Sequence, residues 1–161
     1  MSLDAVEHTR KTFRPYKITT LFVGESAPAG GDFFYYGTSG MTRYMRSVIE
    51  EALGPGEDFL ARFKGLGWYL DDLVLAPVDK LAKPKRIAAC RSAQSGLAER
   101  IAEYKPQAIV TLLLSIRDIV DGAAIQARSI APRYAVPFPG MGQQGRFAKE
   151  MKAIIPLLPR N

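Results

Sequence analysis

Short apolar runs alternate along this chain with longer segments whose apolar residues recur at helical spacing. Three runs predict buried strands, at residues 18–23 (ITTLFV), 69–75 (YLDDLVL) and 108–114 (AIVTLLL). The third is apolar nearly throughout, as a strand covered on both faces should be. A short last strand is predicted at residues 134–138, where Pro137 favours an edge or a terminus.

The segments between these runs predict helices. In residues 41–53 the apolar residues share one helical face, with Thr38 or Ser39 as the N-cap and Gly54-Pro55-Gly56 as the stop. Ser115 is the predicted cap of a later helix. Helical patterns also cover residues 59–64, 87–104, 116–127 and 147–158, while residues 1–17 read as a polar lead-in, 83–86 (KPKR) as a basic loop and 139–145 as a flexible loop.

The alternation of strands and helices predicts an α/β fold, with a central, mainly parallel four-stranded sheet in a three-layer α/β/α arrangement. We expect a single domain over residues 1–161, with no separate linker or repeat. In such sheets the loops at the carboxyl ends of the strands form the binding cleft. Four segments should therefore gather there: the loop after Val23, residues 71–77, the loop after Leu114 and residues 137–145.

Charge and composition narrow the class of partner. The net charge of +6 and pI near 9.5 favour a polyanion, and we expect DNA as the partner; the alternative is a solvated basic surface without a partner. No apolar run approaches the roughly 20 residues that cross a bilayer. The N-terminus lacks the apolar core of a secretory signal, so we expect a cytoplasmic protein that does not bind membranes.

Cysteine and histidine are too scarce for several kinds of site. The chain has one cysteine, Cys90, and one histidine, His8 in the polar lead-in. A single thiol cannot hold an iron–sulfur cluster or a structural zinc, so we expect no metal, no cluster and no cofactor. Cys90 as a nucleophile would need a histidine partner, and we expect it to be buried and neutral instead.

The loop after the first strand reads GESAPAGGDFFYYG, from Gly24 to Gly37. It contains neither a GxGxxG nor a GxxxxGK[ST] pattern, so nothing predicts a dinucleotide or P-loop site. Its Glu25 is a candidate catalytic carboxylate; the alternative is a carboxylate bonded to nearby loop amides. Phe33, Phe34, Tyr35 and Tyr36 follow at once, and each ring is either a core residue or a platform on which a nucleobase stacks.

These features together resemble the uracil-DNA glycosylase superfamily, most closely the branch whose first loop begins Gly-Glu. The resemblance rests on Gly24-Glu25-Ser26 after a buried strand and on an aromatic followed by Gly37-x-Ser39-Gly40 before a helix. Three further segments agree in order: residues 69–75, residues 105–110 (KPQAIV) and residues 136–140 (VPFPG). Together the matching segments span residues 18–158.

The resemblance implies a role for each matching position. In that family the first loop positions water or stabilises charge, which falls here to Glu25 and Ser26. An aromatic a few residues on stacks the flipped base, and Tyr35, or failing that Phe34, takes this position. The family's base-reading Asn corresponds to Asp72, and its late-loop His falls near Phe138. The candidate catalytic residues are thus Glu25 and Ser26, and the candidate base-binding residues are Tyr35, Phe34, Asp72 and Phe138.

Two of these positions depart from the family pattern. No histidine follows His8, so the usual donor to the leaving base is missing. An ionised Asp72 accepts hydrogen bonds but cannot donate, so it would suit a base edge rich in donors, whereas a protonated Asp72 would mimic Asn. The alternative for Asp72 is a structural helix or turn cap. We expect its neighbour Asp71 to face the other side of the sheet or solvent.

The late loop is the candidate DNA-contact region. Met141 is placed to wedge into a duplex, and three polar or basic residues are placed to contact phosphates or bases; the alternative is a plain surface loop. The DNA-contact candidates are Met141, Gln143, Gln144 and Arg146, with a second basic run in Lys80, Lys83, Lys85, Arg86 and Arg91.

The expected function is that of a uracil-DNA glycosylase-like protein, which binds a flipped nucleobase and hydrolyses its N-glycosidic bond. The alternative is a catalytically silent member of the same fold that binds nucleic acid or a nucleotide. A third reading is an α/β hydrolase or transferase acting on a small molecule through Glu25 or Ser26. A Ser-His triad does not fit, since no histidine lies near Ser26 in the sequence.

Overall fold

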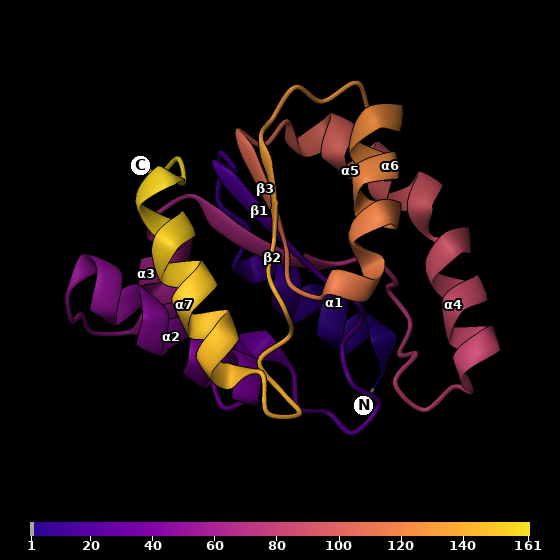
Figure 1. Cartoon of the computed structure of the whole chain (residues 1–161), viewed down its shortest axis with the longest axis horizontal. Helices are drawn as coiled ribbons and strands as arrows, with labels where there is room; N and C mark the ends of the chain where they lie inside the picture. Colours follow the sequence, from indigo (N-terminus) through magenta and orange to yellow (C-terminus); the bar gives the residue numbers. More distant parts are fainter. Residues whose placement is uncertain (1) are drawn as a thin grey trace.

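Four parallel strands form the centre of the computed structural model, which describes residues 2–161 (Figure 1). They are β1 (Thr20–Gly24), β2 (Trp68–Asp72), β3 (Ala108–Thr111) and β4 (Arg133–Ala135). Their order is β2-β1-β3-β4, with Gly24 opposite Asp72 in the β1–β2 pair. The predicted α/β class and parallel sheet are therefore confirmed, and β4 occupies the predicted edge.

Helices cover both faces of this sheet (Figure 1). On one side lie α2 (Gly40–Leu53), α3 (Phe59–Gly65) and α7 (Gln144–Ile154). On the other lie α4 (Lys83–Ser92), α5 (Gln94–Tyr104) and α6 (Arg117–Gln126). Three short 3₁₀ helices complete the fold: η1 (Phe34–Tyr36), η2 (Leu114–Ile116) and η3 (Ile155–Leu157).

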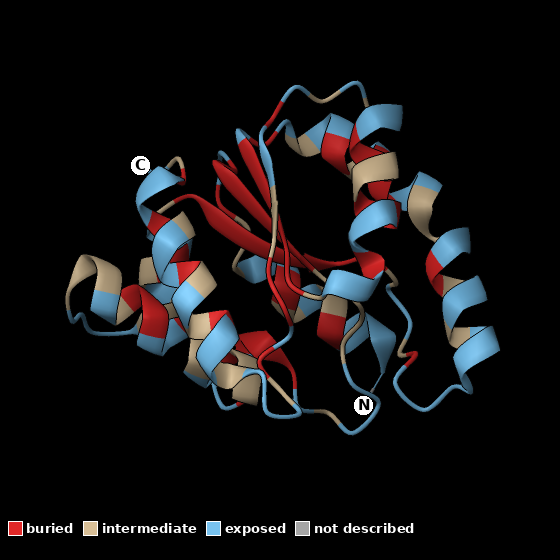
Figure 2. Cartoon of the chain, viewed as in Figure 1, coloured by how far each residue is buried: buried red, intermediate tan, exposed pale blue. Residues whose placement is uncertain are grey.

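The core lies between the sheet and these layers, and Figure 2 shows buried residues along the strands and on the inward sides of the helices. The strands β1, β2 and β3 are buried almost throughout, because helices pack on both of their faces. The ring of Phe22 in β1 packs against Phe63 in α3 and Trp68 in β2, with centroids 5.5 and 5.4 Å away. Ser39 caps α2 by accepting a hydrogen bond from the Thr42 backbone N–H, as one of the two predicted caps.

The polar lead-in predicted for residues 1–17 is wrong for most of its length. Residues Leu3–Thr12 form a helix, α1, capped by Ser2, whose hydroxyl accepts from the Ala5 N–H. Asp4 in the first turn and Arg10 in the last complement the helix dipole. His8 lies on this helix and is exposed. Few apolar residues stand in α1, so hydrophobic periodicity alone did not reveal it.

Other boundaries differ in detail. The predicted basic loop at residues 83–86 is the first turn of α4, where Pro84 fits because the first turn needs no intrahelical N–H donor. The single helix predicted over residues 87–104 is two helices that meet at Ala93. Ser115 lies inside η2 and is not a side-chain cap.

Strand β2 forms the other edge of the sheet, and side chains satisfy backbone groups that point away from β1. The Leu70 N–H donates to the Tyr35 hydroxyl oxygen at 2.6 Å, and the Leu70 carbonyl accepts from Arg10 at 3.3 Å. The Asp72 carbonyl accepts from Arg100 at 2.9 Å. This edge is therefore closed by residues from α1, η1 and α5.

Within residues 2–161, no helix combines the length and the apolar character needed to cross a membrane.

Candidate functional site

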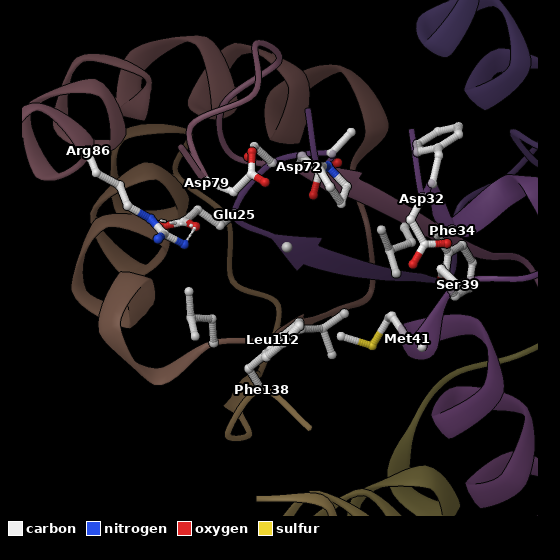
Figure 3. A pocket seen from close by; sticks show the side chains of 18 residues that line it. Glu25, Asp32, Phe34, Ser39, Met41, Asp72, Asp79, Arg86, Leu112 and Phe138 are labelled. Carbon is white, nitrogen blue, oxygen red and sulfur yellow. Dashed lines mark hydrogen bonds and ion pairs between the residues drawn. The ribbon is translucent and has the colours of Figure 1, made fainter. Parts of the chain in front are cut away.

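A cavity of about 340 Å³ opens at the carboxyl ends of β1, β2 and β3, where the loops were predicted to gather (Figure 3). Its volume is at the lower end of the usual range for small-molecule sites, about 300–1,000 Å³. The walls differ in character: Glu25, Asp72 and Asp79 lie along one side, and Met41, Leu112 and Phe138 lie across from them. Such a cavity suits a ligand with one polar edge and an apolar body.

Most of the predicted site residues line this cavity. The structure brings together five of the six catalytic and base-binding candidates, from the segment between β1 and α2, the end of β2 and the late loop, and these five are Glu25, Ser26, Phe34, Asp72 and Phe138. The Ser26 hydroxyl accepts a hydrogen bond from the Val78 N–H at 3.2 Å, which ties the first loop to the segment after β2.

Tyr35, the first choice for a stacking ring, does not line the cavity. Its side chain is 3% exposed, and its ring stacks on Phe13 with centroids 5.1 Å apart. Its hydroxyl is taken by the outward N–H of Leu70, and burial raises its pKa. The Tyr35 assignment is therefore corrected: the ring belongs to the interior because it completes the edge of β2. Phe34, the second choice, reaches the cavity.

Glu25 is held by an ion pair and not by loop amides. Both of its carboxylate oxygens accept hydrogen bonds from the Arg86 guanidinium, and its side chain remains 13% exposed (Figure 3). The Cys90 thiol donates to Glu25 at 3.8 Å. Burial and the neighbouring carboxylate raise the pKa of Cys90, which supports the expectation of a buried, neutral thiol. Arg86 fixes the carboxylate in place and leaves it facing the cavity.

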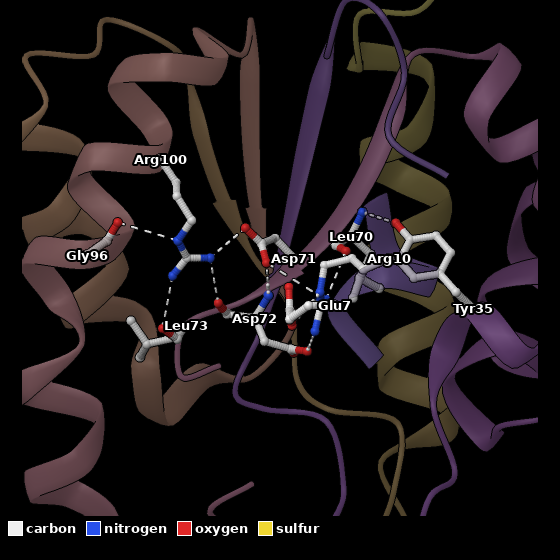
Figure 4. Close-up of polar contacts among 9 residues, drawn as sticks. All are labelled: Glu7, Arg10, Tyr35, Leu70, Asp71, Asp72, Leu73, Gly96 and Arg100. Carbon is white, nitrogen blue, oxygen red and sulfur yellow. Dashed lines mark hydrogen bonds and ion pairs between the residues drawn. The ribbon is translucent and has the colours of Figure 1, made fainter. Parts of the chain in front are cut away.

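Asp72 belongs to a buried ionic network at the end of β2 (Figure 4). Its Oδ2 accepts from Arg10 at 2.9 Å, while Asp71 accepts from Arg100 at 2.5 Å and lies 3.8 Å from Arg10. Asp71 is thus buried and ion-paired, so of the two expectations for it, the other side of the sheet or solvent, exposure to solvent is wrong. Burial raises the pKa of Asp72, and the charge of Arg10 opposes that rise. Burial also acts to lower the pKa of Arg10, but the carboxylates of Asp72 and Asp71 outweigh it and the net shift is upward.

The second oxygen of Asp72, Oδ1, is not bonded by Arg10. Within residues 2–161 no group donates a hydrogen bond to Oδ1, although Asp72 lines the cavity. This oxygen also lies against Gly24: a Cβ added at Gly24 would be 2.6 Å from it. The absence of a side chain at position 24 therefore makes room for the carboxylate. Asp72 is neither a helix cap nor a turn cap; it is a fixed acceptor in the cavity wall.

Two aromatic surfaces bound the cavity. Phe33 and Phe34 form part of the wall but are almost fully buried, so little of either ring is accessible. Phe138 is 46% exposed and offers the most accessible ring surface. A planar ligand can therefore contact the accessible Phe138 ring.

The predicted DNA-contact residues lie beside the cavity and not in it. Met141 is 98% exposed at a positive φ of 57°, on the loop that follows Phe138. Gln144 and Arg146 begin α7, with Gln143 immediately before them, and Arg146 pairs with Glu150 at 3.4 Å. Their position on the surface fits contact with a large ligand, which remains a prediction.

Sequence reasoning missed several side chains of the site. Arg10 was missed because residues 1–17 were interpreted as a polar lead-in. The N-cap Ser2, the acidic Asp4 in the first turn and the basic last turn are nevertheless signals of a helix. Arg86 was read as a phosphate contact and instead holds Glu25. Asp32 and Asp79 line the cavity from loops whose course no local pattern gives.

Among residues 2–161, no group of three or more His, Cys, Asp or Glu side chains is placed to hold a metal ion. No protein-family model matches this chain, and no curated protein matches it at a significant level.

Replacing Arg10 by Met should destabilise the protein by about 3–5 kcal/mol near neutral pH, because Asp72 is left as an uncompensated buried charge. The double variant Arg10→Met/Asp72→Asn should recover part of this loss. Without Arg10 the pKa of Asp72 rises further, and a raised pKa stabilises the protonated, folded form at low pH. The difference in free energy of unfolding between the wild-type protein and Arg10→Met, measured with denaturant, should therefore become smaller as the pH falls from about 7 to about 4. An unchanged free energy of unfolding near pH 7 would show that the pair does not matter.

Replacing Gly24 by Ala should displace the Asp72 carboxylate, because the new methyl would overlap Oδ1. We expect a loss of about 1–3 kcal/mol in the free energy of unfolding. Gly30→Ala is the matched control: it lies in the same loop, and nothing lies within 4 Å of its added Cβ. It should change stability by less than about 1 kcal/mol. Equal effects of the two variants would argue against the packed contact.

Proposed function

We propose that this protein binds a nucleobase flipped out of DNA and hydrolyses its N-glycosidic bond, as a divergent uracil-DNA glycosylase-like enzyme. The observation that carries the proposal is the convergence of Glu25, Ser26, Phe34, Asp72 and Phe138 on one cavity. These positions are up to 113 residues apart in sequence, and the resemblance gives each of them a role at one site. The parallel sheet brings the strand-end loops to one edge, and at that edge these five side chains line the same cavity.

The chemistry of the walls fits a single heterocycle. The apolar side of the cavity and the exposed Phe138 ring can hold a base face, and base–aromatic stacking contributes about 1–3 kcal/mol. Asp72 can accept a hydrogen bond from the base edge through Oδ1. A base reaches such a cavity only outside the helical stack, and extrusion costs a few kcal/mol. The net charge of +6 supplies the attraction for the DNA backbone that offsets this cost.

Glu25 is the candidate catalytic residue. Departure of the base leaves positive charge on the sugar, which a nearby carboxylate stabilises, and the same carboxylate can orient and deprotonate water. The ion pair with Arg86 holds Glu25 in one orientation. It also reduces the negative charge that Glu25 offers, an observation that favours the catalytically silent alternative. Base release by the wild-type protein distinguishes the two functions.

The test uses duplexes that carry one uracil, hypoxanthine or alkylated purine, with base release and DNA affinity measured separately. Glu25→Gln should reduce release about 100-fold or more, the usual scale for loss of an acid–base group, and leave DNA affinity nearly unchanged. Glu99→Gln is the control, since Glu99 is exposed on α5 and does not line the cavity.

Three outcomes separate the functions. Release of a base by the wild-type protein and its loss in Glu25→Gln support the enzyme. Salt-dependent DNA binding with every base left intact supports the silent alternative. Failure to bind DNA even at low salt excludes both and points to a small-molecule ligand.

A further inference from the structure

The polar lining of the cavity is acidic, although the protein as a whole is basic. Glu25, Asp32, Asp72 and Asp79 line it, against a single cationic side chain, Arg86 (Figure 3). Arg86 is committed to Glu25, and Asp72 is paired from behind by Arg10. Within residues 2–161, no Lys or Arg lies within ion-pair distance of Asp32 or Asp79. A ligand in this cavity therefore meets a surplus of negative charge.

The cavity is also poor in free donors. The Ser39 hydroxyl is engaged, since it caps α2 and bonds the Thr42 hydroxyl, whereas the Ser26 hydroxyl accepts from the Val78 N–H and keeps its own proton as a donor. The wall formed by Leu112, Met41 and Phe138 offers no polar side chain. A base that departs as an anion, as uracil does, needs a donor or cation to receive the developing charge. In these walls the Ser26 hydroxyl is a neutral donor, and the cationic Arg86 guanidinium is already bonded to Glu25.

From this charge distribution we infer that the cavity selects a base that is cationic while attached to DNA, namely an N-alkylated purine such as 7-methylguanine. The inference rests on the proposed function and narrows its substrate class. A cationic purine is attracted by the carboxylates and by the Phe138 ring face. The N1–H and 2-amino groups of 7-methylguanine are donors, which match the free Oδ1 of Asp72.

The reaction balances without a donor to the leaving base. Water adds through its oxygen to C1′ of the sugar, and the C1′–N9 bond breaks. The electron pair of that bond returns to the purine ring, which departs neutral. The proton of the water passes to Glu25 and then to solvent. The positive charge on the base is thus removed in the same step, and the missing late-loop histidine is not needed.

The first test compares 7-methylguanosine with guanosine by calorimetry, just below neutral pH so that the alkylated base keeps its N1 proton. The two nucleosides differ only by the methyl group and its charge. We expect at least about tenfold tighter binding of 7-methylguanosine. Equal affinity, or no binding of either, would overturn the inference whatever the protein does to DNA.

The second test measures base release from otherwise identical duplexes with one 7-methylguanine or one uracil, corrected for spontaneous loss without protein. We expect 7-methylguanine to be released at least about tenfold faster. Release of uracil with 7-methylguanine left at the spontaneous rate would overturn this inference and leave the proposed function standing. If the protein released neither base and did not bind DNA, both the proposed function and the inferred preference for a cationic base would be wrong.

Variants test whether the charge is responsible. Asp72→Asn should shift the preference from 7-methylguanine toward uracil, because Asn both donates and accepts. Asp32→Asn is the variant less expected to disturb folding, since Asp32 is exposed and pairs with no cation among the described residues. It should lower affinity for 7-methylguanosine roughly fivefold without changing that for guanosine. Equal losses for both nucleosides would argue against charge selection. Glu99→Gln again serves as the control and should change the affinity for neither nucleoside.

Discussion

The insertion of Arg10 into the end of β2 is the interaction on which the rest of the site depends. Arg10 is 1% exposed, and its guanidinium contacts the Asp72 carboxylate, the Leu70 carbonyl and the face of the Phe33 ring. A buried pair of this kind is costly to desolvate and is retained where geometry matters more than stability. Here it fixes one carboxylate oxygen, leaves the other free and joins α1 to the sheet.

The remaining geometry of the cavity follows from this anchor. With Oδ2 held by Arg10, Oδ1 must lie against Gly24, and the strand register places those two residues side by side. On the same side of the cavity a second arginine, Arg86, holds the other carboxylate, Glu25, through both of its oxygens. Each functional carboxylate is thus oriented by an arginine from outside the strands. The cavity keeps a negative lining inside a protein whose outer surface is positive.

The sequence predicted the sheet and the position of the cavity, because β1 and β3 lie in largely apolar runs, β2 begins with apolar residues, and parallel strands end at one edge. It also predicted Glu25, Asp72 and Phe138 in that cavity. It could not place Tyr35, since an aromatic beside a loop looks the same whether its hydroxyl satisfies a strand edge or its face lines a cleft. It missed Arg10 because α1 buries only Val6 and Arg10, which leaves almost no periodic apolar signal. Long-range ion pairs have no local signature.

The closed border of β2 has a consequence for how the molecule behaves at high concentration. An open strand border is a template on which another chain can extend a sheet. Here Tyr35, Arg10 and Arg100 already occupy the outward amide and carbonyls of Leu70 and Asp72. At the opposite border β4 has three residues, with Pro132 before it and Pro137 soon after. The bonded groups of β2 and the short, proline-flanked β4 therefore both disfavour the addition of a strand from another chain.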